Sequence, residues 1–77
     1  MAENKQTTPN PPKYGVVTNC GSLNMRKGRS TDTEIITIIP VDMKVRIISH
    51  KDGWYRVEYV GEKKFAGYCM EEYIKEI

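Results

Sequence analysis

From Tyr14 onward the chain consists of short runs rich in β-branched and aromatic residues, each closed by residues that favour turns. Runs of this length, recurring about every 8 to 12 residues, are typical of small all-β domains. The predicted strands are 14–19, 23–27, 34–39, 43–49, 54–60, 64–70 and 74–77, with a short turn at 71–73. The pattern gives little support for helix and predicts an all-β fold.

Two of these runs alternate apolar and polar side chains as a half-buried strand does. In 43–49, Val45 and Ile47 alternate with Lys44 and Arg46, and 54–60 has two chemically different faces. Between these runs, the pair at 52–53, Asp-Gly, favours a tight hairpin turn. In so short a chain, five to seven strands close most simply into a small, partly open antiparallel β-barrel.

Length and composition fit one globular domain. The chain has 77 residues, of which 39% are hydrophobic and 29% charged, and its formal net charge is +2. No apolar run approaches the roughly 20 residues of a membrane-spanning helix. The N-terminus also lacks the basic-then-apolar pattern of a signal peptide. We therefore expect no membrane partner, and either export with a parent protein or release by lysis.

The first 13 residues differ from the rest. Between Met1 and Pro12 there is no large aliphatic residue after Met1, and 7–12 contains only Thr, Pro and Asn. This composition is typical of a flexible linker. The expected division is a linker at 1–13, joined to something upstream, and a folded domain at 14–77. The alternative, that 9–12 is a ligand for a proline-recognising domain, lacks the usual aromatic and basic anchors.

Four landmarks in the region 14–77 resemble the bacterial SH3 domain. The family's Leu-Asn-Val-Arg-x-Gly-Pro-Ser stretch corresponds to Leu23–Ser30, and its apolar strand, turn and Lys-Val pair correspond to Ile35–Val45. Its Gly-Trp pair before an alternating strand and its closing Gly-Tyr and Tyr-Ile pairs follow in order, at 53–54, 67–68 and 73–74. The chain departs from the family at Arg29, usually Pro, at Asp42, usually Gly, and at Met25, usually β-branched.

The resemblance implies a non-catalytic cell-wall-binding module. Similar domains target phage endolysins and autolysins to peptidoglycan cross-bridges, stem peptides or attached polymers. The implied partners are therefore the peptidoglycan of Gram-positive bacteria and an upstream hydrolase domain reached through the linker. The implied place of action is extracellular or at the wall, and no cofactor is implied.

Exposed aromatic rings along a groove would grip a peptide or a sugar face with little loss of side-chain entropy, and polar side chains would add directional hydrogen bonds. Six residues are predicted to bind the ligand in this way: Tyr14, Asn24, Arg26, Trp54, Tyr68 and Tyr73. Each also has a purely structural interpretation. Asn24 could satisfy a turn, Arg26 could lie on a solvated face, and Tyr14 could plug the barrel. For Trp54 we expect partial burial with one exposed face.

Cys20 and Cys69 are the two cysteines of the chain. Cys20 follows the first predicted strand, and Cys69 lies in the strand that leads to the last. Because the first and last strands of such a barrel lie side by side, a disulfide is compatible with the fold. Closing a loop of about 50 residues would contribute on the order of 4 kcal/mol in the chain-entropy model. Two reduced, buried thiols are the alternative, and the sequence leaves both open.

Catalysis and metal binding have little support. The only histidine, His50, is expected in a surface turn. It has no identifiable orienting partner there, and the histidine of a thiol hydrolase would need one. Two cysteines and one histidine do not form a zinc pattern, so no metal is predicted.

Two other binding functions remain as alternatives. Arg56, Lys63, Lys64, Phe65 and Tyr68 could form a basic, aromatic patch for single-stranded nucleic acid. Glutamates interrupt that patch, which disfavours it. The other alternative is a protein–protein adaptor or oligomerisation domain of a wall hydrolase.

Overall fold

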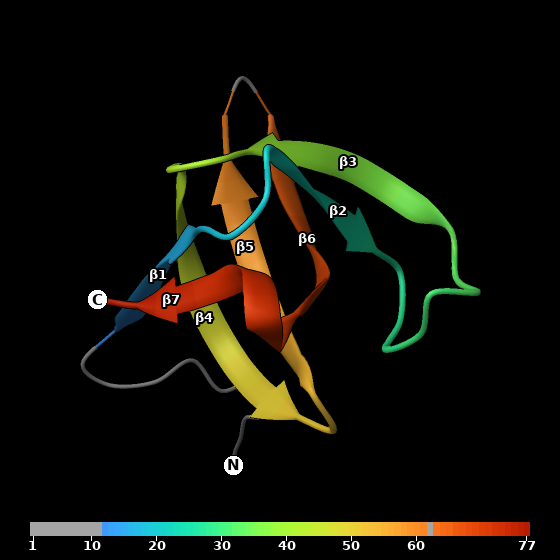
Figure 1. The fold of residues 1–77 in the computed structure, drawn as a ribbon. Helices are drawn as coiled ribbons and strands as arrows, with labels where there is room; N and C mark the ends of the chain where they lie inside the picture. The colour runs from blue at the N-terminus through green and yellow to red at the C-terminus, as the bar shows by residue number, and fades with distance from the viewer. Residues whose placement is uncertain (1–11, 62) are drawn as a thin grey trace, which may run out of the picture.

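A computed structural model describes residues 12–61 and 63–77, so almost all of the expected linker lies outside the described residues. The domain consists of seven short strands and one 3₁₀ helix (Figure 1). The elements are β1 (Lys13–Val17), β2 (Ser22–Arg26), β3 (Ile35–Pro40), β4 (Lys44–Lys51), β5 (Trp54–Val60), β6 (Lys64–Met70), η1 (Glu71–Tyr73) and β7 (Ile74–Glu76).

The strands form one antiparallel sheet in the order β3-β2-β6-β5-β4-β1-β7. The sheet curls on itself, with the β2–β3 hairpin on one side and β1 with β7 on the other (Figure 1). Because β3 and β7 are the two edges of the sheet, strand-to-strand hydrogen bonds close the barrel only partly. The predicted all-β, partly open antiparallel fold is confirmed. Among the described residues there is no helix long and apolar enough to cross a membrane.

Small differences between predicted and observed strands have local causes. β1 begins at Lys13 and ends at Val17, before the predicted end at Asn19. Asn19 has φ 64°, a left-handed conformation that cannot continue a strand. β4 continues to Lys51 because the hairpin with β5 turns tightly at Asp52 and Gly53.

Both turn predictions that depend on left-handed backbone are confirmed. Asp52 and Gly53 have φ of 56° and 83°, the pair of positive values that a two-residue hairpin turn of type I′ requires. Asp42, where the family usually has Gly, has φ 70°. Asp tolerates this conformation better than most residues, so the departure from the family leaves the turn intact.

The core lies inside the curled sheet. Its alternating inward positions include Val45 and Ile47 of β4 and Val57 of β5, none more than 3% exposed. The remaining members of the cluster are Val17, Leu23, Met25, Ile39, Tyr55, Cys69 and Ile74. The alternation predicted for 43–49 therefore assigned the inward face correctly.

Candidate functional site

A groove of about 280 Å³ lies beside β2, and we call it the β2 groove. Asn24 and Arg26 come from β2, Thr31 from the loop that follows, and Tyr73 from η1. Its lining is completed by Cys20, Ser22, Leu23 and Met70. Three of the six predicted ligand-binding residues, Asn24, Arg26 and Tyr73, thus meet in one depression.

The loop after β2 is held in place by Arg26. Nη1 of Arg26 donates hydrogen bonds to the carbonyl oxygens of Thr31 and Thr33, each at 2.8 Å. Oγ1 of Thr33 donates to the carbonyl of Ser30 at 2.6 Å and accepts from the amide of Gly28. Arg26 therefore forms one wall of the groove and also fixes its rim, and a ligand contact by Arg26 stays a prediction.

Tyr73 of η1 also lines the β2 groove. Its ring is half-buried and packs against the core, and its carbonyl accepts a hydrogen bond from the amide of Thr18 at 2.9 Å. The carboxylate of Glu72 raises the pKa of the Tyr73 hydroxyl above its ordinary value. Asn24, by contrast, is exposed on β2. The groove thus offers an anchored ring and a solvent-facing amide.

Trp54 corrects a prediction. Its side chain is only 9% exposed, so the expected open face of the ring is absent. Like Ile48, Trp54 is buried but does not belong to the main core cluster. Alternation along β5 places Trp54 on the outward face of the sheet, but alternation does not show what covers that face.

The two remaining predicted residues lie outside the β2 groove. Tyr68 of β6 is flanked by guanidinium groups, with Arg29 at 4.7 Å and Arg56 at 5.9 Å from the ring centroid. Tyr14 of β1 is 37% exposed and lines a separate pocket, where the ammonium of Lys44 lies 4.5 Å from its ring centroid. The structure therefore divides the six residues among different surfaces.

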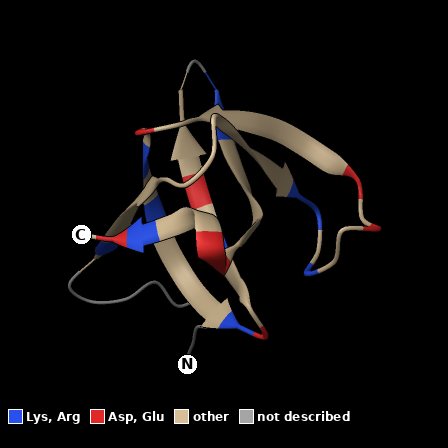
Figure 2. Cartoon of the chain, viewed as in Figure 1, with Lys and Arg blue, Asp and Glu red and all other residues tan. Residues whose placement is uncertain are grey.

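Charges of both signs alternate over the described strands, as Figure 2 shows. Glu58 lies within 4.0 Å of both Arg46 and Lys64, which interrupts the positive surface near β6. A continuous positive track, the usual footprint of nucleic-acid binding, is not seen among the described residues.

The cysteines are both free thiols, with Cys20 half-buried and Cys69 fully buried. The Sγ of Cys20 donates to the carbonyl of Thr18 at 3.3 Å. Burial, followed by the nearby Cys20, raises the pKa of Cys69 to about 12. A thiol held neutral in this way is a poor nucleophile. The structure contains the reduced alternative, and a disulfide between the two stays a prediction.

His50 also corrects a prediction, because it lies on β4 and has a partner. Its Nε2 is hydrogen-bonded to Oε1 of Glu71, and its ring stacks on Tyr55 with centroids 4.5 Å apart. Tyr55 pairs with His50 on one side and with Cys69 on the other. His50 therefore joins the end of β4 to η1, and Tyr55 stands between it and the buried thiol. Within the described part of the chain, no three His, Cys, Asp or Glu side chains group as metal ligands would.

Together, a small curled antiparallel sheet, a groove beside its β2–β3 hairpin and a buried neutral thiol define a small, partly open β-barrel domain. A family profile described as the bacterial SH3 domain matches residues 21–75. The chain belongs to the bacterial SH3 family, as its four landmarks indicated. Domains of this family are generally non-catalytic binding modules and often occur in cell-wall-associated proteins. A search of curated proteins found no match to the chain.

Proposed function

We propose that this domain is a non-catalytic module that binds bacterial peptidoglycan and holds an attached hydrolase, of the endolysin or autolysin kind, against the wall. Its place of action is then outside the cell or at the cell wall. The family supports wall association. The observation that carries the proposal is the β2 groove, where Asn24, Arg26 and Tyr73 converge from two elements.

The chemistry of the groove suits a short peptide or sugar segment. The ring of Tyr73 is held by the core, so it offers apolar surface with little entropy left to lose on binding. Asn24 is exposed and can both donate to and accept from a ligand amide or hydroxyl. A single groove of this size gives modest affinity, and repetition of the ligand on the wall together with tethering to a second wall-binding domain raises retention.

Co-sedimentation with purified peptidoglycan from several Gram-positive bacteria tests the proposal. We expect the domain to pellet with some walls and to remain bound in high salt, because the contacts in the groove are mainly uncharged. Asn24→Ala combined with Tyr73→Leu is expected to weaken pelleting about tenfold, with the leucine keeping apolar contact to the core. Ser49→Ala, an exposed change on β4, is the matched control and should pellet like the parent domain.

Two results would contradict wall binding through this groove. One is a domain that stays in the supernatant with every wall or is released by modest salt. The other is equal pelleting of the groove variant and the Ser49→Ala control.

Self-association is a second candidate function, favoured by the outer side of β3. This strand is an edge of the sheet, and Ile35 and Ile38 are 43% and 55% exposed on it. Edge strands with exposed apolar side chains are suited to pairing with a second strand. Sedimentation velocity should show a dimer that Ile38→Thr disrupts and that Val60→Thr, 67% exposed and on the interior strand β5, does not.

A further inference from the structure

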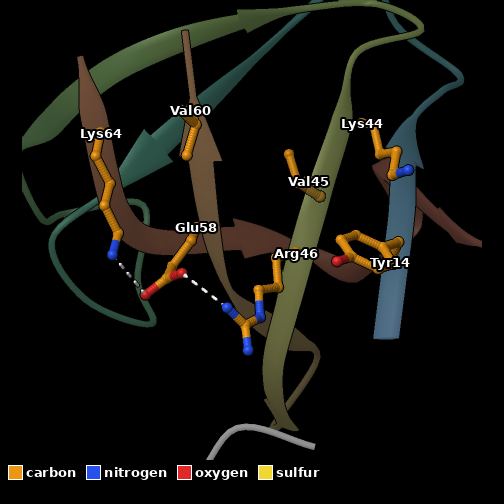
Figure 3. A pocket seen from close by; sticks show the side chains of 7 residues that line it. All are labelled: Tyr14, Lys44, Val45, Arg46, Glu58, Val60 and Lys64. Atoms are coloured by element: carbon orange, nitrogen blue, oxygen red, sulfur yellow. Dashed lines mark ion pairs between the residues drawn. The ribbon is translucent and has the colours of Figure 1, made fainter. Parts of the chain in front are cut away.

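A second pocket, of about 390 Å³, lies on the outer face of the sheet (Figure 3). It is lined by Tyr14, Lys44, Val45, Arg46, Glu58, Val60 and Lys64, and we call it the cationic pocket. It shares no residue with the β2 groove. Glu58, Val60 and Lys64 belong to the turn end of the β5–β6 hairpin, whereas Met70 of the β2 groove pairs with Trp54 at the other end.

Strand register explains why six of these side chains share a face, whereas the seventh, Val45, points into the core. Tyr14 of β1 pairs with Arg46 of β4, and Arg46 pairs with Glu58 of β5. Paired residues point to the same side of a sheet, and so do residues two positions apart on one strand. Lys44 therefore lies beside Arg46, and Val60 beside Glu58. Lys64 completes the set because it pairs with Val60.

The charges of the cationic pocket are unbalanced. Three cations face a single carboxylate, that of Glu58, which lies 4.0 Å from Arg46 and 3.7 Å from Lys64. Both separations are long for an ion pair, and Lys64 is 65% exposed, so neither pair is strong. Lys44 lies over the ring of Tyr14, with no carboxylate of the described residues within ion-pair distance.

Arg46 has an unused donor as well. Its Nε is buried and has no hydrogen-bond partner within the part of the chain that the structure describes. The guanidinium reaches into the pocket between Glu58 and the ring of Tyr14 (Figure 3). A buried donor without an acceptor is rare, because its desolvation is uncompensated. An acceptor that draws the guanidinium toward it would relieve this, and Glu58 does not, because its carboxylate lies 4.0 Å from Nη1 rather than beside Nε.

We propose that the cationic pocket binds the phosphate group of an organic phosphate ester. The oxygens of phosphate accept hydrogen bonds from several directions, which suits three cationic donors that come from two strands, β4 and β6, whereas a carboxylate is satisfied by one planar partner. The pocket is also larger than a phosphate ion alone needs, and Tyr14 and Val60 provide apolar surface for the body of the ester. This site is independent of the proposed wall binding through the β2 groove.

Titration of the full chain, followed by ¹⁵N NMR, tests the phosphate site. With glycerol 3-phosphate at constant ionic strength, we expect saturable shifts of the amides of Lys44, Arg46, Glu58 and Val60. Acetate at the same ionic strength should shift them far less. The double variant Lys44→Gln, Lys64→Gln is expected to bind about tenfold more weakly, since two charged contacts are lost. Lys51→Gln removes one positive charge from an exposed lysine outside the pocket and should bind like the parent chain.

The source of the ester is distinguished by a second arm with vesicles of phosphatidylglycerol. Binding to the soluble ester without co-flotation on vesicles identifies a soluble or polymeric ester as the ligand, and co-flotation lost in the double variant identifies a lipid headgroup. The proposal is overturned by shifts that do not saturate, by equal responses to acetate, or by equal weakening in Lys51→Gln. Lys44→Arg with Lys64→Arg, which restores the charges, should restore binding, and its failure to do so also counts against the site. Loss of this site leaves co-sedimentation through the β2 groove unchanged.

Discussion

At the scale of single residues, Gly67 is the position with least room. A Cβ there would lie 2.7 Å from the carbonyl oxygen of Arg26 and from Cγ of Met25, and 2.9 Å from Cδ1 of Ile36. The carbonyl belongs to the backbone of β2 and cannot turn aside. β6 can therefore pass this close to β2 and β3 only where the side chain is a hydrogen atom.

Gly67→Ala is expected to destabilise the domain by about 1–3 kcal/mol, because the added methyl forces β6 away from β2. Urea unfolding followed by the fluorescence of Trp54 measures the change. Gly21→Ala is the control, since nothing lies within 4 Å of a Cβ at that position. Its effect should stay within about 0.5 kcal/mol. Equal losses at the two glycines would show that backbone freedom, rather than close packing, is what matters.

At the scale of elements, the loop after β2 depends on Arg26. One nitrogen of its guanidinium supplies both hydrogen bonds to the carbonyls of Thr31 and Thr33. Arg26→Ala is expected to cost about 1–3 kcal/mol of stability, since these bonds have a charged donor. It should also speed hydrogen exchange at the amide of Thr33, which donates to Ser30.

The control for the Arg26 prediction is Lys27→Ala. Lys27 forms an ion pair with Glu34 at 3.1 Å, but both side chains are at least 66% exposed. An exposed pair contributes about 0–1 kcal/mol. If Lys27→Ala speeds exchange at Thr33 as much as Arg26→Ala does, the ion pair and not the guanidinium orders the loop.

β7 is a three-residue edge strand, and a side chain from β5 helps to hold it. The hydroxyl of Tyr55 donates to Oε2 of Glu76 at 2.8 Å. Tyr55→Phe should lower stability by about 0.5–1.5 kcal/mol. Because Glu76 is half-exposed, water replaces part of the lost bond. A double-mutant cycle with Glu76→Gln measures the coupling, and additive effects would mean that the bond contributes nothing.

Elements were more predictable from the sequence than the site was. Strand positions follow from local patterns: β-branched runs, the Asp52-Gly53 turn and the alternation of Val45 and Ile47. The cationic pocket depends instead on register, since Tyr14, Arg46 and Glu58 meet only because three strands pair in one alignment. No local pattern encodes that alignment, although the outward positions of β4 and β5 were already marked by their charges.

The same limit explains the divided set of predicted ligand-binding residues. Asn24 and Arg26 share a face because they are two positions apart on β2, which a sequence pattern shows. Tyr73 joins them because η1 brings it to the same groove. The sequence signal for Tyr73 was the family's closing Tyr-Ile pair at 73–74. The burial of Trp54 depends on what covers the outer face of β5, and alternation carries no information about that.

At the scale of the whole molecule, three groups with raised pKa values, Cys69, Tyr55 and Tyr73, make stability depend on pH in the alkaline range. Burial raises the pKa of Cys69 from 9.0 to about 12. Burial first, and then the hydrogen bond to Glu76, also raises the pKa of Tyr55 above 10.0. In the unfolded chain all three groups ionise at their ordinary pKa, so the unfolded state loses protons that the folded state keeps. Stability is therefore full below about pH 9 and falls as pH rises toward 12.

Urea unfolding between pH 7 and pH 11 in the presence of a reductant measures this dependence, with Cys69→Ala as the comparison. The variant should be less stable at pH 7, because a buried side chain is truncated, but its stability should fall less steeply above pH 9 because no thiol titrates. The decline that remains belongs to Tyr55 and Tyr73, and Tyr55→Phe should make it shallower. Parallel curves for the parent and Cys69→Ala would contradict the expected thiol ionisation.

The same measurement without reductant decides between the two cysteine states that the sequence left open. A thiol in a disulfide has no proton to lose, so an oxidised parent domain should lose the steep alkaline decline and gain on the order of 4 kcal/mol from loop closure. If the curves with and without reductant coincide after exposure to air, the thiols do not pair. The reduced state, with the hydrogen bond from Cys20 to Thr18 and the burial of Cys69, then persists in the oxidising surroundings where a wall-binding domain would act.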